Sequence, residues 1–567
     1  LLAGMVTYAA LYDAPPPAAF AVPRDIAAPI RENYAEIAEI IGEMRPDQAR
    51  MQDRSEQSGG DETSASHEAQ AVPPTLGEPK ARDDAPASRG QRRSAAARDS
   101  NATVPVVGEP ALGLGLAGLE DWSTQHPFLD LMKSARPWVG HTEARWGGVS
   151  TDYLRAGGYL DVDGWPLRVP EGATRLESLF LTDMPADAGY LRGDYVMLYD
   201  GQADFELTGR ATRVRYEPGR VTFSYEPGPG VVGIAIDALP EDDAIHNIRI
   251  VKRALMPLYE AGAIFNPDWI ARIADARVVR FMDWMQTNGS PIARWGDRPR
   301  LSDATWTAWG VPVEIMVRLA NKIGADPWFT LPHRADDDYV RRFAQQVRAQ
   351  LDPRLKAHVE YSNEVWNWMF EQAAWAKARA DERWGEAGDG WMQYYGMRAA
   401  QVADIWADVF GDEAEDRLVR VVGVQTGWPG LENAVLTAPL AMLELGKMPR
   451  DSFDAYAVTG YFGYEMGGEE MAPVLEDWLD QAEAAAREAG EALGLSRVAL
   501  REYVRTHRFD TAIAPLTEAL RKGSLKELTQ EILPYHAEVA DAAGLRLIMY
   551  EGGTHLAARG AQLDNQR

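Results

Sequence analysis

The chain has 567 residues and carries 58 Lys and Arg against 85 Asp and Glu, a formal net charge of −27. This charge repels phosphate backbones, so we expect no nucleic-acid partner and a neutral or cationic ligand instead. The chain contains no cysteine, which rules out a disulfide framework, a thiolate metal site and a cysteine nucleophile. Its length allows one domain of barrel size with additional segments.

The N-terminal region is predicted to tether the protein. Residues 1–30 begin with the stretch "LLAGMVTYAALYDAPPPAAF", whose apolar run ends at Asp13, just before a proline cluster. It is shorter than the roughly 20 apolar residues that span a bilayer, but it fits part of a signal or anchor helix as well as an ordinary terminus. Residues 31–105 are predicted to be a mostly disordered linker, because from 45 to 103 they contain no aromatic residue. We therefore expect a location outside the cytoplasm, with a membrane tether through the N-terminus.

Residues 106–152 are predicted to hold a first barrel strand, "LGLGL", and its loop. From 153 to 245 apolar and polar residues alternate, and "TRVRY" and "RVTFSY" flank the turn "EPG", so an all-β insert of antiparallel hairpins is expected. The insert is either a carbohydrate-binding module, with Trp165, Tyr195 and Tyr199 as contacts, or a wall beside a cleft. The wall is favoured because the sequence forms no clear aromatic platform.

Residues 246–567 alternate between strands and helices. Apolar runs predict strands at 277–284, 327–333, 357–364, 420–426, 454–461 and 546–553, and amphipathic stretches predict helices at 312–325, 337–351 and 469–494. Apolar strands alternating with such helices indicate a parallel sheet with helices outside it. Counting the first strand there are seven, so we expect an α/β fold, a (β/α)8 TIM-type barrel truncated after strand seven. Together with the missing initiator Met, this suggests a piece of a longer protein.

The predicted strands end in polar and aromatic residues. In a barrel the active site lies where the strands end at their carboxyl side, so these side chains are expected to share one opening. In chain order they are Arg280, Asp283, Trp284, His333, Asn363, Glu364, Trp428, Tyr461 and Glu551.

The pair "NE" at 363–364 and "YEGG" at 550–553, in this order on strands four and seven, resemble glycoside hydrolase clan A, the retaining (β/α)8 glycosidases. The resemblance implies that Glu364 is the acid/base, that Asn363 contacts the sugar 2-hydroxyl and that Glu551 is the nucleophile. It also implies three supporting residues: Arg280 beside the nucleophile, His333 lining the site and Tyr461 touching the nucleophile.

Two carboxyl groups suit this chemistry because cleaving an acetal needs a proton on the leaving oxygen and a negative partner for the oxocarbenium-like centre. Aromatic rings stack on the C–H faces of sugars, so the tryptophans near the strand ends are candidate substrate contacts, although a single Trp is more often core packing. Those named as substrate contacts are Trp284, Trp366 and Trp428, with Trp295 and Trp306 as further subsites and Asp283 as a reserve carboxylate.

Non-catalytic explanations remain for both glutamates. Glu364 also fits the cap or first turn of a following helix. Glu551 also fits a surface loop before "GG", although its alternation with Leu547 and Met549 puts it on the inward face of its strand. A slipped register on strand four would make Glu360 the better candidate.

The sequence predicts no metal and no cofactor. His333 lies near three aspartates at 336–338, but no second His stands at ligand spacing. The expected function is a retaining glycoside hydrolase that cleaves β-linked polysaccharide or oligosaccharide with two glutamates. The alternatives are a non-catalytic glycan-binding or matrix protein and a transglycosylase that uses the same site.

Overall fold

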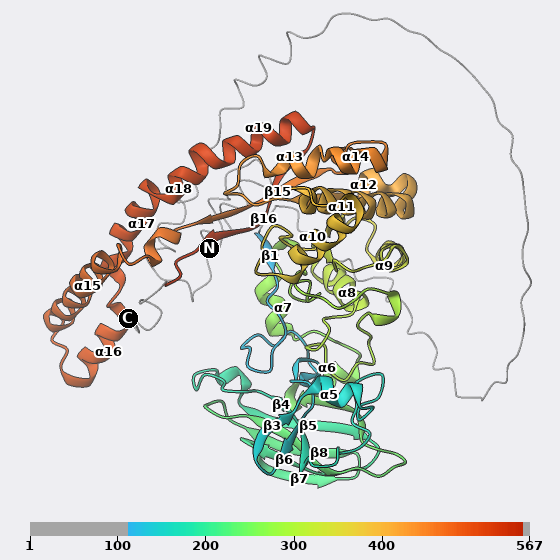
Figure 1. Ribbon diagram of the computed structural model, residues 1–567. Coiled ribbons are helices and arrows are strands. Elements are labelled where there is room, and N and C mark those ends of the chain that lie inside the picture. The colour runs from blue at the N-terminus through green and yellow to red at the C-terminus, as the bar shows by residue number, and fades with distance from the viewer. Residues whose placement is uncertain (1–111, 559–567) are drawn as a thin grey trace, which may run out of the picture. The chain divides into compact units, whose positions relative to one another are not determined.

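The computed structural model describes residues 112–558 (Figure 1), so the predicted N-terminal anchor and linker lie outside the described residues. Seven strands form one parallel sheet, nearly closed like a barrel, in the order β1-β11-β12-β13-β14-β15-β16. Their bounds are β1 (Leu112–Gly115), β11 (Ala276–Arg280), β12 (Asp326–Leu331), β13 (Ala357–Tyr361), β14 (Leu418–Gly423), β15 (Ala455–Phe462) and β16 (Arg546–Thr554). The predicted α/β class with a barrel-like parallel sheet of seven strands is confirmed.

The central strands of this sheet are covered on both faces. Every residue of β12 and β13 is buried, which explains why they read as continuous apolar runs. Four strands end two to four residues earlier than predicted: β11 at Arg280, β12 at Leu331, β13 at Tyr361 and β14 at Gly423. After Arg280 the chain turns, with the amide of Met285 donating to the carbonyl of Phe281 at 2.8 Å. The apolar residues of this turn join the core, so the sequence pattern alone extended the strand too far.

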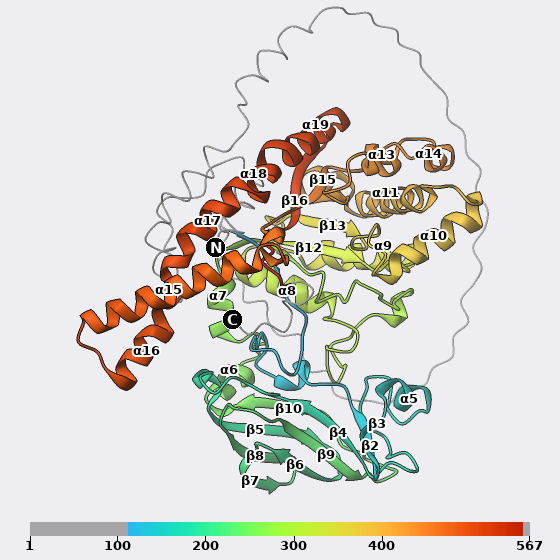
Figure 2. The ribbon, with the colours of Figure 1, turned by 60° about the vertical axis from the view of Figure 1, so that its left-hand side comes forward.

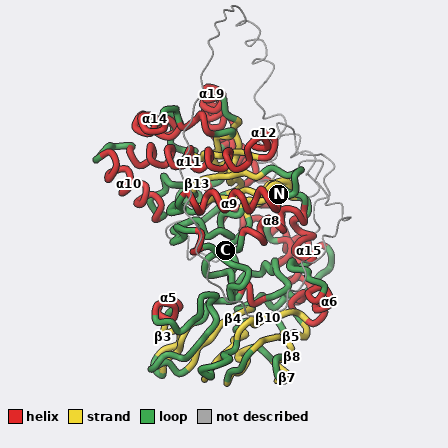
Figure 3. Tube along the Cα trace, turned by 90° about the vertical axis from the view of Figure 1, so that its right-hand side faces the viewer, coloured by secondary structure: helices red, strands yellow, loops and turns green. Residues whose placement is uncertain are grey.

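Helices pack against the sheet, as Figure 3 shows for α8, α9 and α11. Helix α8 contacts β12, and α11 contacts β13 and β14. Helix α14 packs against α11, and α19 contacts β15 and β16. The helices are α8 (Val313–Ile323), α9 (Asp337–Gln350), α10 (Glu371–Trp384), α11 (Gly390–Phe410), α12 (Ala414–Arg417), α13 (Leu431–Leu436), α14 (Pro439–Leu445), α15 (Ala472–Ala492), α16 (Arg497–His507), α17 (Ile513–Lys522), α18 (Ser524–Glu527) and α19 (Leu533–Ala543). Within residues 112–558, no helix has the length and apolar character needed to cross a membrane.

Two of these helices show why the sequence predicts them well. Helix α8 buries an apolar stripe. It is capped at its C-terminus by Gly324, whose φ of 71° is the left-handed conformation that glycine adopts without strain. Helix α9 begins after Asp336, whose side chain accepts from the amide of Tyr339 at 2.8 Å and so caps the helix.

Between β1 and β11 the chain forms two antiparallel sheets, β10-β5-β8-β7 and β3-β2-β4-β9-β6 (Figure 2). We call this region the β-sandwich, because buried residues of both sheets share one core. Its strands are β2 (Val139–Thr142), β3 (Arg145–Val149), β4 (Arg175–Phe180), β5 (Gly193–Asp200), β6 (Asp204–Gly209), β7 (Thr212–Glu217), β8 (Arg220–Tyr225), β9 (Val232–Ala238) and β10 (His246–Lys252). Two short helices contact these strands, α5 (Thr151–Ala156) with β2 and α6 (Met256–Glu260) with β10, whereas α7 (Pro267–Ile273) buries Trp269 and Ile273 in the core of the parallel sheet.

The aromatic residues considered as glycan contacts in this region serve its core instead. Trp165 and Tyr195 are both buried in the β-sandwich core, and Tyr199 packs against the same core while partly exposed. The interpretation of Trp165 and Tyr195 as surface contacts is therefore wrong, because their rings have no face open to a ligand.

Candidate active site

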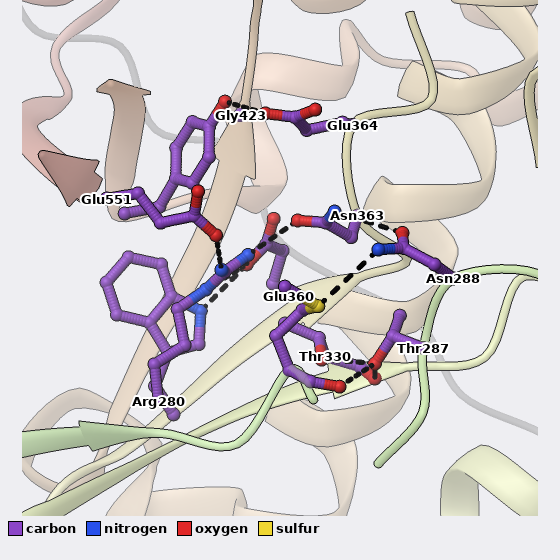
Figure 4. A network of polar contacts seen from close by, with 12 residues as sticks. Arg280, Thr287, Asn288, Thr330, Glu360, Asn363, Glu364, Gly423 and Glu551 are labelled. Atoms are coloured by element: carbon purple, nitrogen blue, oxygen red, sulfur yellow. Dashed lines mark hydrogen bonds and ion pairs between the residues drawn. The ribbon is translucent and has the colours of Figure 1, made fainter. Parts of the chain in front are cut away.

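Arg280, the last residue of β11, organises the carboxyl end of the sheet (Figure 4). Its side chain is almost completely buried and donates to Glu551 at 2.8 Å, to Glu360 at 3.0 Å and to the amide oxygen of Asn363 at 2.9 Å. Burial alone would lower the pKa of Arg280, but the charges of Glu360 and Glu551 raise it by more. The pKa of Arg280 therefore lies above its ordinary value. Arg280 therefore stays a cation that ties β11, β13 and β16 together.

The two carboxylates on Arg280 differ in exposure. Glu360 is buried, with its side chain 2% exposed, and also accepts a hydrogen bond from the indole N–H of Trp328 at 2.9 Å. The side chain of Glu551 is 27% exposed and accepts from the hydroxyl of Tyr461 at 2.8 Å. Only Glu551 is accessible to a substrate, so Glu360 is not the better catalytic candidate and instead holds Arg280 in place.

Strand β16 carries an irregularity where it enters the site. Val458 pairs with Met549 and Thr459 with Glu551, which leaves Tyr550 as an extra residue in β16. Such a bulge interrupts the alternation of side chains, so the alternation argument from Met549 does not extend to Glu551. As a result two consecutive residues reach the site: Glu551 contacts Arg280, and the hydroxyl of Tyr550 donates to Glu364 at 2.9 Å.

Glu364 lies in the turn that follows β13. Its φ is 42° and that of Ser362 is 63°, an uncommon left-handed conformation for residues other than glycine, and one that often marks functional sites. Both carboxylate oxygens of Glu364 accept hydrogen bonds, one from the hydroxyl of Tyr550 and the other from the side-chain amide of Asn367 at 3.0 Å. The next helix, α10, has Phe370 as its N-cap. The helix-cap interpretation of Glu364 is therefore wrong.

Tyr550 and Tyr461 act as hydrogen-bond donors to Glu364 and Glu551, respectively. Burial and the negative charges of Glu364 and Glu551 raise the pKa of Tyr550 well above its ordinary value. Burial and the charge of Glu551 likewise raise the pKa of Tyr461. Each hydroxyl therefore remains protonated at neutral pH and donates a charge-assisted hydrogen bond.

Asn363 is fixed from both ends of its side chain. Its amide oxygen accepts from Arg280, and its amide nitrogen donates to Asn288 at 3.1 Å. Gln372 of α10 donates to the same Asn288 oxygen at 2.6 Å and to the backbone carbonyl of Asn363 at 2.7 Å. The loop after β11 and helix α10 thus hold the turn after β13 in one orientation. Asn288 and Gln372 carry no sequence motif that would have identified them.

The structure brings together Arg280, Asn363, Glu364, Tyr461 and Glu551, but several other predicted contacts lie elsewhere. Trp284 is 2% exposed and stacks on Trp269 in the core, so it has no face for a sugar. Trp306 is also buried, with its ring edge against Phe128. Trp284 was placed at a strand end because the apolar run hid the turn after Arg280, and Trp306, predicted as a further subsite, has no open face either. Asp283 is exposed in that turn.

His333 lies just beyond the end of β12 and is buried beside Trp375 of α10, with ring centroids 5.7 Å apart. Neither of its ring nitrogens has a hydrogen-bond partner within the part of the chain that the structure describes. Burial, assisted by the neighbouring Arg334, lowers its pKa to about 4. His333 is therefore a neutral imidazole at physiological pH and makes no hydrogen bond to either glutamate.

Trp366 and Trp428 differ in exposure. Trp366 is buried against Tyr550 and Tyr395, at centroid distances of 6.3 and 6.2 Å, and so backs the residue that holds Glu364. Trp428, in the loop after β14, is 49% exposed. Another exposed indole, Trp368, belongs to the loop after β13 and packs against Trp391 at 4.9 Å. Trp368 and Trp428 therefore offer aromatic faces on adjacent loops at the carboxyl end of the sheet.

Comparison with models of protein families finds no match, and comparisons with curated proteins and with solved structures find none either. Within residues 112–558, no group of three or more His, Asp or Glu side chains is arranged to hold a metal ion. The chemistry of the site is thus argued from its own residues: two accessible carboxylates, a buried cation, two tyrosine donors and an amide.

Proposed function

We propose that this protein is a retaining glycoside hydrolase that cleaves β-linked polysaccharide or oligosaccharide by double displacement. The observation that carries the proposal is the unequal surroundings of two accessible carboxylates at one end of the sheet. Glu551 is bonded to a buried cation, Arg280, and to the hydroxyl of Tyr461. Glu364 has only neutral partners, Tyr550 and Asn367.

These surroundings support a division of roles. A carboxylate bonded to a buried guanidinium and to a tyrosine hydroxyl is held in a fixed direction, which suits the group that attacks the anomeric carbon. A carboxyl whose hydrogen-bond partners are all neutral has no ion pair to break when a proton is transferred, which suits a general acid/base. Glu551 is therefore assigned as the nucleophile and Glu364 as the acid/base.

The reaction then has two steps. In the first, Glu364 gives its proton to the leaving glycosidic oxygen while Glu551 forms a bond to the anomeric carbon. In the second, Glu364 takes a proton from water, the water oxygen replaces Glu551 on that carbon, and the configuration is retained. Asn363 keeps one amide N–H beyond the one that it donates to Asn288, and the two tyrosine oxygens can accept hydrogen bonds from sugar hydroxyls beside this carbon.

The fold is interpreted within the same proposal. The seven-stranded sheet is treated as seven strands of a (β/α)8-type barrel, with the β-sandwich as an insert that follows the first strand and forms a wall. A polysaccharide substrate and a location outside the cytoplasm are part of the proposal, and Trp368 and Trp428 are candidate platforms for sugar rings beyond the cleaved bond.

The test is Glu551→Gln, assayed on a panel of β-linked polysaccharides. Loss of the nucleophile is expected to lower kcat/KM by at least ~10⁴-fold while polysaccharide binding, measured by affinity electrophoresis, persists. Glu470→Gln, at an exposed position between β15 and α15, is the matched control and should keep full activity. If the wild-type protein binds glycans but hydrolyses none, the binding-protein alternative is correct. Products elongated by an added sugar acceptor would instead indicate a transglycosylase.

A further inference from the structure

A cavity of about 240 Å³ lies away from the two glutamates, between the β-sandwich region and the loop that joins β11 to α8. At about 30 Å³ per water molecule, this is space for about eight waters, which is enough for one sugar ring. Its lining includes two indoles, one guanidinium and three carboxylates: Trp138, Trp309, Arg155, Asp161, Asp163 and Asp303.

The frame around the cavity is rigid. Lys133 donates to the carbonyl of Asp303 at 2.5 Å, and Ser302 donates to the carboxylate of Asp163 at 2.8 Å. The amide of Ala304 donates to the carbonyl of Asp163 at 2.7 Å. These bonds join the β11–α8 loop to the sandwich side, so the cavity is preformed and a ligand would meet no ordering cost there.

The polar groups of the lining keep hydrogen-bonding capacity. Trp138 is 1% exposed, and its indole N–H has no acceptor within the described residues. Asp163 uses one oxygen to accept from Ser302, and Asp303 uses one to accept from the amide of Arg300 at 2.8 Å. The remaining oxygens are acceptors, and the buried indole N–H is a donor that a buried site should satisfy.

Arg155 completes the lining. Its guanidinium lies over the ring of Trp309, 4.6 Å from the centroid, and makes no ion pair within 4 Å among residues 112–558. An open guanidinium, aromatic surface and carboxylate acceptors around one preformed space suit a molecule with apolar C–H faces and many hydroxyls. Three carboxylates against one Arg disfavour an anionic ligand such as a uronic acid.

We propose that this cavity is a second carbohydrate site, which binds one neutral sugar residue of a glycan chain away from the cleaved bond. The inference rests on the proposed function, since it takes the glycan as the ligand. The loop that frames the cavity also carries Asn288, which bonds to Asn363 in the active site, so a chain bound here would be held by the segment that also positions the catalytic turn.

The test uses the Glu551→Gln protein labelled with 5-fluorotryptophan, with the Trp309 resonance identified by Trp309→Phe. Cellobiose, xylobiose and N,N′-diacetylchitobiose are titrated at millimolar concentration, and 19F NMR follows Trp309. At least one disaccharide is expected to shift this resonance, and Arg155→Gln and Asp303→Asn should each weaken that titration about tenfold. Arg168→Gln is the matched control, because Arg168 also lies over an aromatic ring, that of Tyr159 at 4.9 Å, outside the cavity, and it should leave the titration unchanged.

A Trp309 resonance that none of the three disaccharides moves would overturn the inference, as would affinities unchanged by both cavity variants. The proposed function fails separately, if the wild-type protein hydrolyses no glycan, because the Trp309 titration does not depend on turnover.

Discussion

The surroundings of Glu551 and those of Glu364 differ in charge, although Tyr550, the neighbour of Glu551 in the chain, donates a hydrogen bond to Glu364. Glu551 lies against a buried cation that is itself held by Glu360 and Asn363. Glu364 lies in a strained turn and is held by neutral groups alone. Identical side chains at one site can thus be suited to separate roles by the charge of their partners.

After Glu551→Gln, the largest loss of activity is expected from Glu364→Gln. The variant cannot protonate the leaving oxygen, so kcat/KM on polysaccharide should fall ~10²–10⁴-fold. With a dinitrophenyl glycoside, whose leaving group needs no proton, the loss in the first step should be much smaller. Equal losses on both substrates would contradict the acid/base role.

Much of the fold behind these two glutamates was predictable from the sequence, because strands buried on both faces must be apolar along their whole length. The predicted strands 327–333 and 357–364 correspond to β12 and β13. The errors came where apolar residues continue past a strand. Trp284 belongs to a turn whose side chains fill the core, and no local pattern separates such a turn from a strand end.

The site was predictable only in part, for physical reasons. Tyr550 was missed because its position depends on a bulge in β16 that only the pairing with β15 reveals. The role of Glu360 depends on an ion pair with Arg280, which is distant in the sequence but adjacent in the sheet. Carboxylates look alike in a sequence, and only burial separates one that holds an arginine from one that can meet a substrate.

The ion pair between Glu360 and Arg280 gives a second test of how Glu551 is held. Glu360→Gln removes one partner of a buried ion pair, which typically costs about 3–5 kcal/mol in the free energy of unfolding. Urea denaturation should show this loss, together with reduced activity, because Arg280 is no longer held toward Glu551. Glu483→Gln, which removes an exposed ion pair with Arg487 on α15, should cost less than about 1 kcal/mol. Similar losses in the two variants would contradict the role of Glu360.

A titratable group at the same end of the sheet, His333, extends the comparison to pH. Its pKa of about 4 lies below the 6.5 of an unfolded chain, so between pH 6.5 and 4 the unfolded chain binds a proton that the folded chain does not. Stability should therefore fall as the pH drops through this window, by up to about 3 kcal/mol from this group. Urea midpoints at pH 7 and 4.5 test this.

In the variant His333→Gln the pH dependence of those midpoints should be weaker than in the wild type. His246→Gln, at an exposed position, serves as the control and should leave the dependence unchanged. An unaltered slope in the His333 variant would contradict the assignment of a neutral buried imidazole.

The finest test uses the two tyrosines as a matched pair. Tyr550→Phe removes the donor to Glu364, and Tyr461→Phe removes the donor to Glu551. Each loss of a hydrogen bond to a charged group is expected to lower kcat/KM about tenfold. The Tyr550 effect should shrink with a dinitrophenyl leaving group, whereas the Tyr461 effect should not. The reverse pattern would exchange the roles of the two glutamates.

The proposal that Glu551 is the nucleophile of a double displacement can be tested by trapping the covalent intermediate. The protein is incubated with a panel of dinitrophenyl 2-deoxy-2-fluoro-β-glycosides, and the labelled peptide is sequenced by mass spectrometry. One sugar is expected on Glu551, with none on Glu364 or Glu360. A label on Glu364, or hydrolysis of natural substrates with inversion of the anomeric configuration, would contradict it.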